Sequence, residues 1–97
     1  MLDHVVSLED AWNSGGWRWP TNGREWRSFF NDVASLCPTA AWVDREKGGQ
    51  NAAQWLPPSQ AFHMRYVIEQ IKIKAKYDLS VTRSEATTMR SILEQGL

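Results

Sequence analysis

Two stretches of helical periodicity constrain the fold of this chain more than any other feature of its sequence. Apolar residues between positions 26 and 33 recur at intervals of three and four, which places them on one face of a helix. A longer helix is expected from Ser59 to about Lys76, with an apolar stripe of its own. Two amphipathic helices of this size need each other to bury their stripes. The expected core residues are Trp26, Phe29, Phe30, Val33, Val67, Ile68 and Ile71.

Capping patterns predict where three helices begin. In each pattern a short polar side chain is followed three residues later by an acidic residue, so that the first side chain can accept a backbone hydrogen bond. The glycine pair at 48–49 is expected to end a short helical turn, because glycine costs a helix about 1 kcal/mol relative to alanine. The three capping pairs are Ser7–Asp10, Asn22–Glu25 and Thr82–Glu85.

Only short stretches of the chain favour β-strands. Residues 2–6 contain two β-branched valines, and the apolar stretch 34–43 is interrupted by Pro38, which limits it to a short or irregular strand. A length of 97 residues is enough for one domain and little more. We therefore expect a single domain over residues 1–97, mainly α-helical with a minimal two-strand sheet (α+β).

Charge, cysteine content and hydropathy predict where the protein is located and which partners it can bind. Eleven basic residues balance eleven acidic ones, so any binding to nucleic acid must rest on a local basic face. Cys37 is the only cysteine, which excludes an internal disulfide. The opening residues MLDHVV do not resemble a signal peptide, and no apolar run is long enough to cross a bilayer. A cytoplasmic protein with no membrane partner is expected.

The Asp3–His4 pair is the first candidate for chemistry. Neighbouring residues on a strand point to opposite faces, so these two side chains can have different roles. A carboxylate is a hard ligand suited to Mg²⁺, and a neutral imidazole can accept a proton from water near pH 7. By itself such a dipeptide is common, and it also fits an N-terminal tail with two ordinary polar residues. The motifs that follow this pair in the chain support a role for it in chemistry.

In their order along the chain, these motifs resemble those of small bacterial and phage HNH endonucleases of the ββα-metal type. Members of that family read D-H-[LIV]-V-P-L, then N-D-L, then N-R-S-K-G and then W-L-P-P, and the resemblance covers nearly the whole chain. The corresponding segments here are Asp3-His4-Val5-Val6-Ser7-Leu8, Asn31-Asp32-Val33, Asp44-Arg45-Glu46-Lys47-Gly48 and Trp55-Leu56-Pro57-Pro58.

The resemblance implies a ββα-metal core followed by C-terminal helices, with the activity of a metal-dependent endonuclease or nickase acting on nucleic acid, expected to be DNA. Carried over by position, His4 is the general base that activates water. Asp3 and Asp44 are the ligands of one divalent metal ion, Mg²⁺ or else Mn²⁺, which stabilises charge on the phosphate. Arg45 and Lys47 are expected to bind phosphate groups.

Two departures from the family pattern leave alternatives open. Asp44 stands where the family has asparagine, which adds negative charge to the site. The sequence also begins two residues before Asp3, whereas the relatives carry a long upstream segment, so such a segment is expected to be lacking here. One alternative is a degenerate HNH-like module that binds nucleic acid or a protein partner without cutting. Another is a domain completed by a further subunit or by a homo-oligomer.

Overall fold

A computed structural model describes residues 2–96 and shows a mainly helical chain with one two-stranded antiparallel sheet. This architecture confirms the predicted fold class. Three 3₁₀ turns connect the longer elements, at Gly16–Arg18, Val33–Ser35 and Gln60–Phe62. The strands and helices are β1 (Leu2–His4), α1 (Leu8–Asn13), α2 (Arg24–Phe30), β2 (Leu36–Pro38), α3 (Ala41–Lys47), α4 (His63–Lys76) and α5 (Arg83–Gln95).

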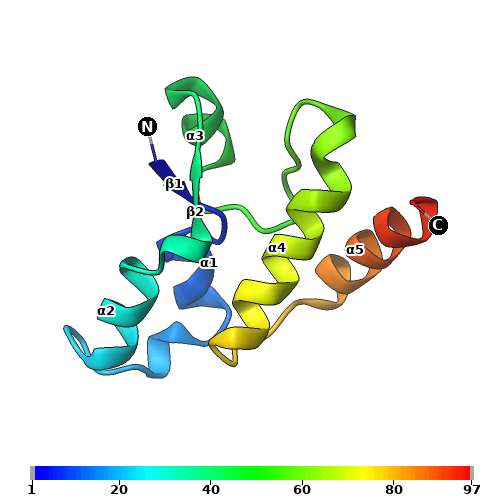
Figure 1. Cartoon of the computed structure of the whole chain (residues 1–97). Helices are drawn as coiled ribbons and strands as arrows, with labels where there is room; N and C mark the ends of the chain where they lie inside the picture. Colours follow the sequence, from blue (N-terminus) through cyan, green and yellow to red (C-terminus); the bar gives the residue numbers. More distant parts are fainter. Residues whose placement is uncertain (1, 97) are drawn as a thin grey trace.

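The sheet brings the start of the chain beside its middle. Strand β1 pairs antiparallel with β2, and the register places Asp3 opposite Cys37. Pro38, which has no backbone N–H to donate, is the last residue of β2, as its chemistry requires. Helix α3 begins shortly after β2 and stands next to the two strands (Figure 1). The order strand, strand, helix therefore positions Asp3 close to α3.

Two of the three predicted capping pairs are confirmed. The Ser7 hydroxyl accepts a hydrogen bond from the Asp10 backbone N–H at 3.0 Å, at the start of α1. Thr82 and Glu85 form a complete capping box at the start of α5, with both hydrogen bonds at 3.0 Å. These contacts join residues only three positions apart, so the local sequence contains both partners.

Of the other predicted helix boundaries, some are confirmed and others are wrong. Helix α2 begins after Gly23 with no side-chain cap, while Asn22 adopts a left-handed backbone with φ 58°, so the third capping pair is wrong. Gly48 ends α3 with φ 48°, as predicted. Helix α4 ends at Lys76 as expected, but a 3₁₀ turn follows Ser59 and the α-helix itself begins at His63.

Two hydrophobic clusters form the core, and α4 contributes to both. Figure 1 shows α4 between the N-terminal elements and α5. The first joins α4 to α1 and α2, and the second joins α4 to α5 and to the segment around Ala52. The buried residues are Val6, Ala11, Phe29 and Ile73 in the first cluster and Ala52, Val67 and Met89 in the second.

The predicted core is only partly correct. Phe29 and Val67 are fully buried, whereas Trp26 and Ile68 are half-buried. Three other predicted core residues are exposed: Phe30 at 53%, Val33 at 79% and Ile71 at 38%.

The exposure of Val33 and of Ile71 has a physical cause in each case. Helix α2 ends at Phe30, so Val33 lies on a separate 3₁₀ turn and no longer continues the apolar face of that helix. Helix α4 is rotated away from the predicted phase because it buries two polar side chains, Gln70 and Lys74, together with Ile73. Apolar periodicity could not predict that rotation.

Candidate functional site

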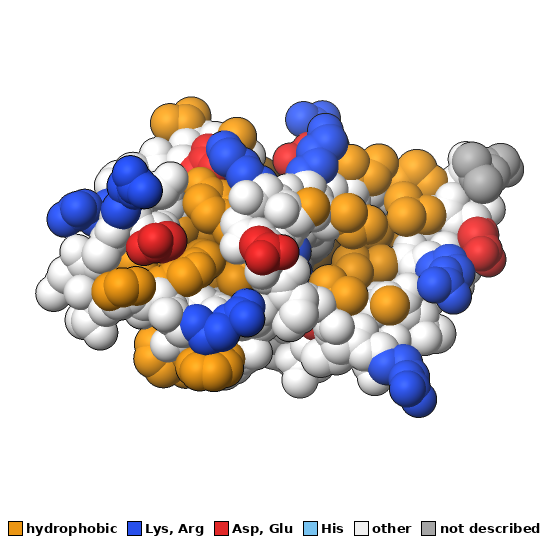
Figure 2. Space-filling view, turned by 90° about the horizontal axis from the view of Figure 1, so that it is seen from below, with side chains coloured by type: hydrophobic (Ala, Val, Ile, Leu, Met, Phe, Trp, Pro, Cys, Tyr) orange, Lys and Arg blue, Asp and Glu red, His pale blue; other side chains and the backbone are white. Residues whose placement is uncertain are grey.

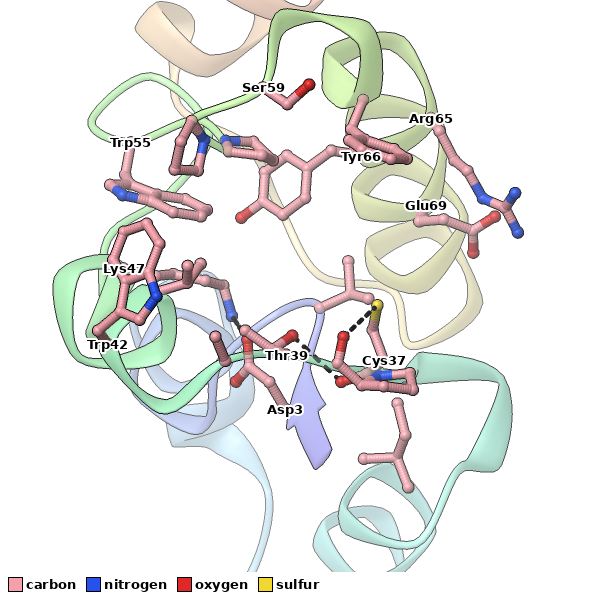
Figure 3. A pocket seen from close by; sticks show the side chains of 18 of the residues that line it. Asp3, Cys37, Thr39, Trp42, Lys47, Trp55, Ser59, Arg65, Tyr66 and Glu69 are labelled. Atoms are coloured by element: carbon pink, nitrogen blue, oxygen red, sulfur yellow. Dashed lines mark hydrogen bonds and ion pairs between the residues drawn. The ribbon is translucent and has the colours of Figure 1, made fainter. Parts of the chain in front are cut away.

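A cleft of about 730 Å³ lies between α3 with β2 on one side and the segment of residues 55–69 on the other. Figure 3 shows Trp42 and Trp55, one from each side, near one end of the cleft, and Arg65 and Glu69, both on α4, near the other end. Its lining is mostly apolar, and its volume falls in the range of small-molecule sites in proteins. The cleft is therefore the candidate functional site.

The wall that contains Trp55 is held in place by contacts with α4. The Trp55 ring packs edge-to-face against Tyr66, with 5.7 Å between ring centroids. The His63 ring donates a hydrogen bond to the Pro57 carbonyl at 2.7 Å, which ties the proline segment to the first turn of α4. Because two prolines in succession have few accessible conformations, this wall keeps its shape. His63 has a structural role here.

A buried ion pair lies on the floor of the cleft. The Lys47 ammonium, from the last residue of α3, donates to the Asp3 carboxylate at 2.9 Å and also to the His4 carbonyl oxygen. The Lys47 side chain is only 2% exposed. A charge at this depth must be paired, because an unpaired ammonium would lose its hydration without compensation.

A second carboxylate, that of Asp44, adjoins the first one. Asp44 lies one helical turn before Lys47 on α3, and its carboxyl is near enough to raise the pKa of Asp3. Burial raises the pKa of Asp3 above its usual value, the Asp44 carboxyl raises it further, and the Lys47 ammonium partly offsets both effects. The fold thus brings Asp3, Asp44 and Lys47 together across more than forty residues of sequence.

His4 lies on the other face of β1, as the alternation of side chains along a strand requires. Its ring hydrogen-bonds to the Phe30 carbonyl at 2.9 Å and stacks on Phe29, with the two ring planes 8° apart. The imidazole therefore packs against α2, on the face of β1 opposite the Asp3–Asp44 pair. The structure brings together the two predicted metal ligands but not the predicted general base.

The two predicted phosphate-binding residues also separate. Arg45 is exposed on α3, next to Asp44 in sequence. Lys47 is instead buried, and its ammonium is already bound by Asp3 and the His4 carbonyl. An ammonium held in this way cannot reach a phosphate without breaking a buried ion pair.

The predicted Mg²⁺ ion does not fit the side chains as they are arranged. The Lys47 ammonium occupies the space beside Asp3 that a metal cation would take. Within residues 2–96, no three or more His, Cys, Asp or Glu side chains are grouped so that they could hold a metal ion.

Sequence reasoning did not single out the aromatic residues of the cleft. Trp42, Trp55 and Tyr66 come from three different segments, and only the tertiary structure brings them to the same cleft. The W-L-P-P motif was one signal in this region, since it contains Trp55 and both prolines of the wall.

Outside the cleft, the described surface has weaker candidates for a binding site. A smaller hollow of about 410 Å³ lies between α4 and α5. On the face shown in Figure 2, basic side chains are scattered between acidic and hydrophobic ones and form no continuous stripe.

Within residues 2–96 no helix combines the length and the hydrophobicity that crossing a bilayer would take. Nucleic acid, a completing subunit and a homo-oligomer stay predictions.

Comparison with known proteins finds one informative similarity. An uncharacterized secreted protein of Arthroderma benhamiae is 40% identical to this chain over 94 residues. The match includes 95% of this chain but 45% of the fungal protein, so the chain spans less than half the length of that relative. No protein-family model matches the sequence. No solved structure matches it either.

This relative corrects two predictions. A protein named as secreted contradicts the cytoplasmic location that was inferred from the opening residues MLDHVV. It also contradicts the predicted function, both the metal-dependent endonuclease and its non-cutting alternative, since the relative is named as a secreted protein and not as a cytoplasmic nuclease. The resemblance to the HNH family itself stays a prediction.

Proposed function

We propose that this chain is a ligand-binding module of a secreted protein, which takes a small, largely apolar molecule into the cleft between α3 and residues 55–69. One observation carries the proposal: mostly apolar walls enclose a floor where a few polar groups converge, and one of them, Asp3, has a raised pKa. Binding sites for small molecules in proteins typically combine these features.

Burial of exposed aromatic rings that line the cleft would favour ligand binding. Trp42 and Phe62 line the cleft and are both more than half exposed to solvent. Covering about 100 Å² of each ring would stabilise a complex by roughly 2.5 kcal/mol per ring, at about 25 cal/mol per Å². Two such contacts would together contribute about 5 kcal/mol, which offsets part of the roughly 4–15 kcal/mol that association costs in lost translational and rotational freedom.

The test is a titration of the protein with 8-anilinonaphthalene-1-sulfonate and with a panel of small aromatic and aliphatic compounds. Binding is monitored by the change in tryptophan fluorescence. We expect saturable binding, weakened about tenfold or more by Trp42→Ala, which removes one wall of the cleft. The matched control is Trp17→Ala, because Trp17 is equally exposed but does not line the cleft. Equal effects of the two substitutions, or no saturable binding, would contradict the proposal.

The extracellular location belongs to the same proposal, and the name of the fungal relative supports it. Antibodies against the purified chain should detect the native protein in the culture medium of its source organism. Detection in the cell fraction alone would overturn this part of the proposal.

A further inference from the structure

The charged side chains that line the cleft balance one another, with two of each sign. Lys47 is bound to Asp3 at 2.9 Å on the floor of the cleft. Arg65 and Glu69 lie one helical turn apart on α4, near the end of the cleft that is away from the tryptophans (Figure 3). An ion that entered the tryptophan end would lose its hydration without gaining an unpaired counter-charge. The lining therefore favours an uncharged ligand.

The Tyr66 hydroxyl has a proton that it can donate to such a ligand. The Gln70 amide nitrogen donates to the Val5 carbonyl and, at 3.0 Å, to the Tyr66 hydroxyl oxygen. Because the Val5 carbonyl fixes which end of the amide faces the tyrosine, the hydroxyl accepts from Gln70 and its own proton points elsewhere. Within residues 2–96 this hydroxyl donates no hydrogen bond. Burial raises the pKa of Tyr66, so the hydroxyl keeps its proton.

The direction of this hydroxyl relates it to the tryptophans of the cleft. Figure 3 shows the Tyr66 hydroxyl pointing into the cleft, toward the end where Trp42 and Trp55 lie. Trp42 is more than half exposed and Trp55 is half-buried, so both indoles have surface left for a ligand. A flat aromatic ring that packed on these indoles would bring its substituent near the hydroxyl.

We propose that the ligand of this cleft is an uncharged aromatic carbonyl compound, whose ring lies between Trp42 and Trp55 and whose carbonyl oxygen accepts a hydrogen bond from the Tyr66 hydroxyl. This inference rests on the proposed function. A carbonyl oxygen suits the position because it accepts a hydrogen bond and has no proton of its own to place. A hydrocarbon of the same shape would leave the hydroxyl proton without an acceptor.

Four compounds of similar shape separate these cases: acetophenone, ethylbenzene, benzoate and benzamidinium. Binding is measured by isothermal titration calorimetry, and independently by the rate at which Cys37 is alkylated. Cys37 is the only cysteine and lines the cleft, so a bound ligand should slow its reaction. We expect acetophenone to bind to the unmodified chain at least about tenfold tighter than either ion, because the ions lose more hydration.

Two variants that each remove one hydroxyl from the cleft locate the contact. Tyr66→Phe keeps the ring that packs against Trp55, and it should weaken acetophenone binding about three- to tenfold, the range expected for one hydrogen bond. Ser59→Ala is the matched control, because Ser59 also lines the cleft but is exposed. It should change acetophenone binding by less than about twofold, and ethylbenzene binding should change as little in both variants. Comparing each compound with itself cancels the difference in hydrophobicity between the compounds.

The outcomes distinguish this inference from the proposed function. The inference is overturned if Tyr66→Phe weakens neither compound, if it weakens both equally, or if either ion binds more tightly than acetophenone. It is overturned as well if only anilinonaphthalene sulfonate binds. In each of these cases the cleft remains a binding site. If none of the compounds binds or protects Cys37 from alkylation, the proposed function fails together with the inference.

Discussion

Lys47 and Lys72 show how differently one residue type can behave within this chain. Lys72 lies on the surface of α4, 68% exposed, with its ammonium 3.8 Å from Glu69. Lys47 is buried at the end of α3, and its ammonium is held by Asp3 and by the His4 carbonyl. Exposed ion pairs contribute little to stability, whereas breaking a buried pair leaves the remaining charge without hydration or partner.

The Lys47→Met variant keeps the length of the side chain and removes its charge. We expect the free energy of unfolding to fall by about 3–5 kcal/mol, because the Asp3 carboxylate would stay buried without its ammonium. Lys72→Met should change it by less than about 1 kcal/mol. Urea denaturation followed by far-ultraviolet circular dichroism measures both. Similar midpoints for the two variants would show that the Asp3–Lys47 pair contributes nothing.

At the scale of elements, α4 organises the molecule through its buried polar side chains. The Lys74 ammonium lies between Asp10 of α1, at 3.1 Å, and Glu85 of α5, at 2.8 Å. The Gln70 amide donates to the Val5 carbonyl next to β1. These contacts turn the Gln70 and Lys74 side of α4 inward. Ile71 consequently faces outward, although its apolar character placed it in the predicted core.

The orientation of α4 can be checked with two isoleucines from the same helix. Ile73→Ala should lower the free energy of unfolding by about 2–5 kcal/mol, because Ile73 is buried in the first hydrophobic cluster. Ile71→Ala should cost less than about 1 kcal/mol, since that side chain is exposed. Helix propensity changes equally in both variants, so it cancels in the comparison. A larger loss for Ile71→Ala than for Ile73→Ala would restore the phase predicted from apolar periodicity.

For the whole molecule, a polar contact ties the segment after α2 to the end of α4. The Asp32 carboxylate accepts hydrogen bonds from Lys76 at 2.6 Å and from the Tyr77 hydroxyl at 2.5 Å. The hydrogen bond from Lys76, followed by that from Tyr77, holds the pKa of Asp32 below its usual value. A carboxyl with a lowered pKa stabilises the fold above its unfolded pKa of about 4, and this contribution is lost as the pH falls through the folded pKa.

Asp32→Asn should therefore destabilise the protein at pH 6, and the difference from the unmodified chain should shrink as the solution is acidified below about pH 4. Thermal melting at a series of pH values measures this convergence. Asp78→Asn is the control, because Asp78 is exposed and its left-handed backbone, with φ 55°, suits asparagine equally well. A constant difference between Asp32→Asn and the unmodified chain at every pH would contradict the role given to the carboxylate.

Features that depend on near neighbours could be predicted from the amino-acid sequence alone. Ser7 and the Thr82–Glu85 pair begin their helices, Gly48 ends α3 and Pro38 limits β2, as predicted. In each case the cause lies within about four residues, in a capping hydrogen bond, a permitted backbone angle or a missing N–H. Such causes can be predicted from a few neighbouring residues because those residues contain all the groups involved.

The burial of particular polar side chains and the position of the cleft depend instead on contacts between distant segments. Lys47 meets Asp3 across 44 residues, and Lys74 meets Asp10 across 64. The aromatic walls of the cleft and the Asp3–Lys47 ion pair on its floor likewise come from separate segments. The free energy of burying a charge depends on the partner that receives it. When that partner lies on a distant segment, local pattern cannot distinguish a buried lysine from a solvated one.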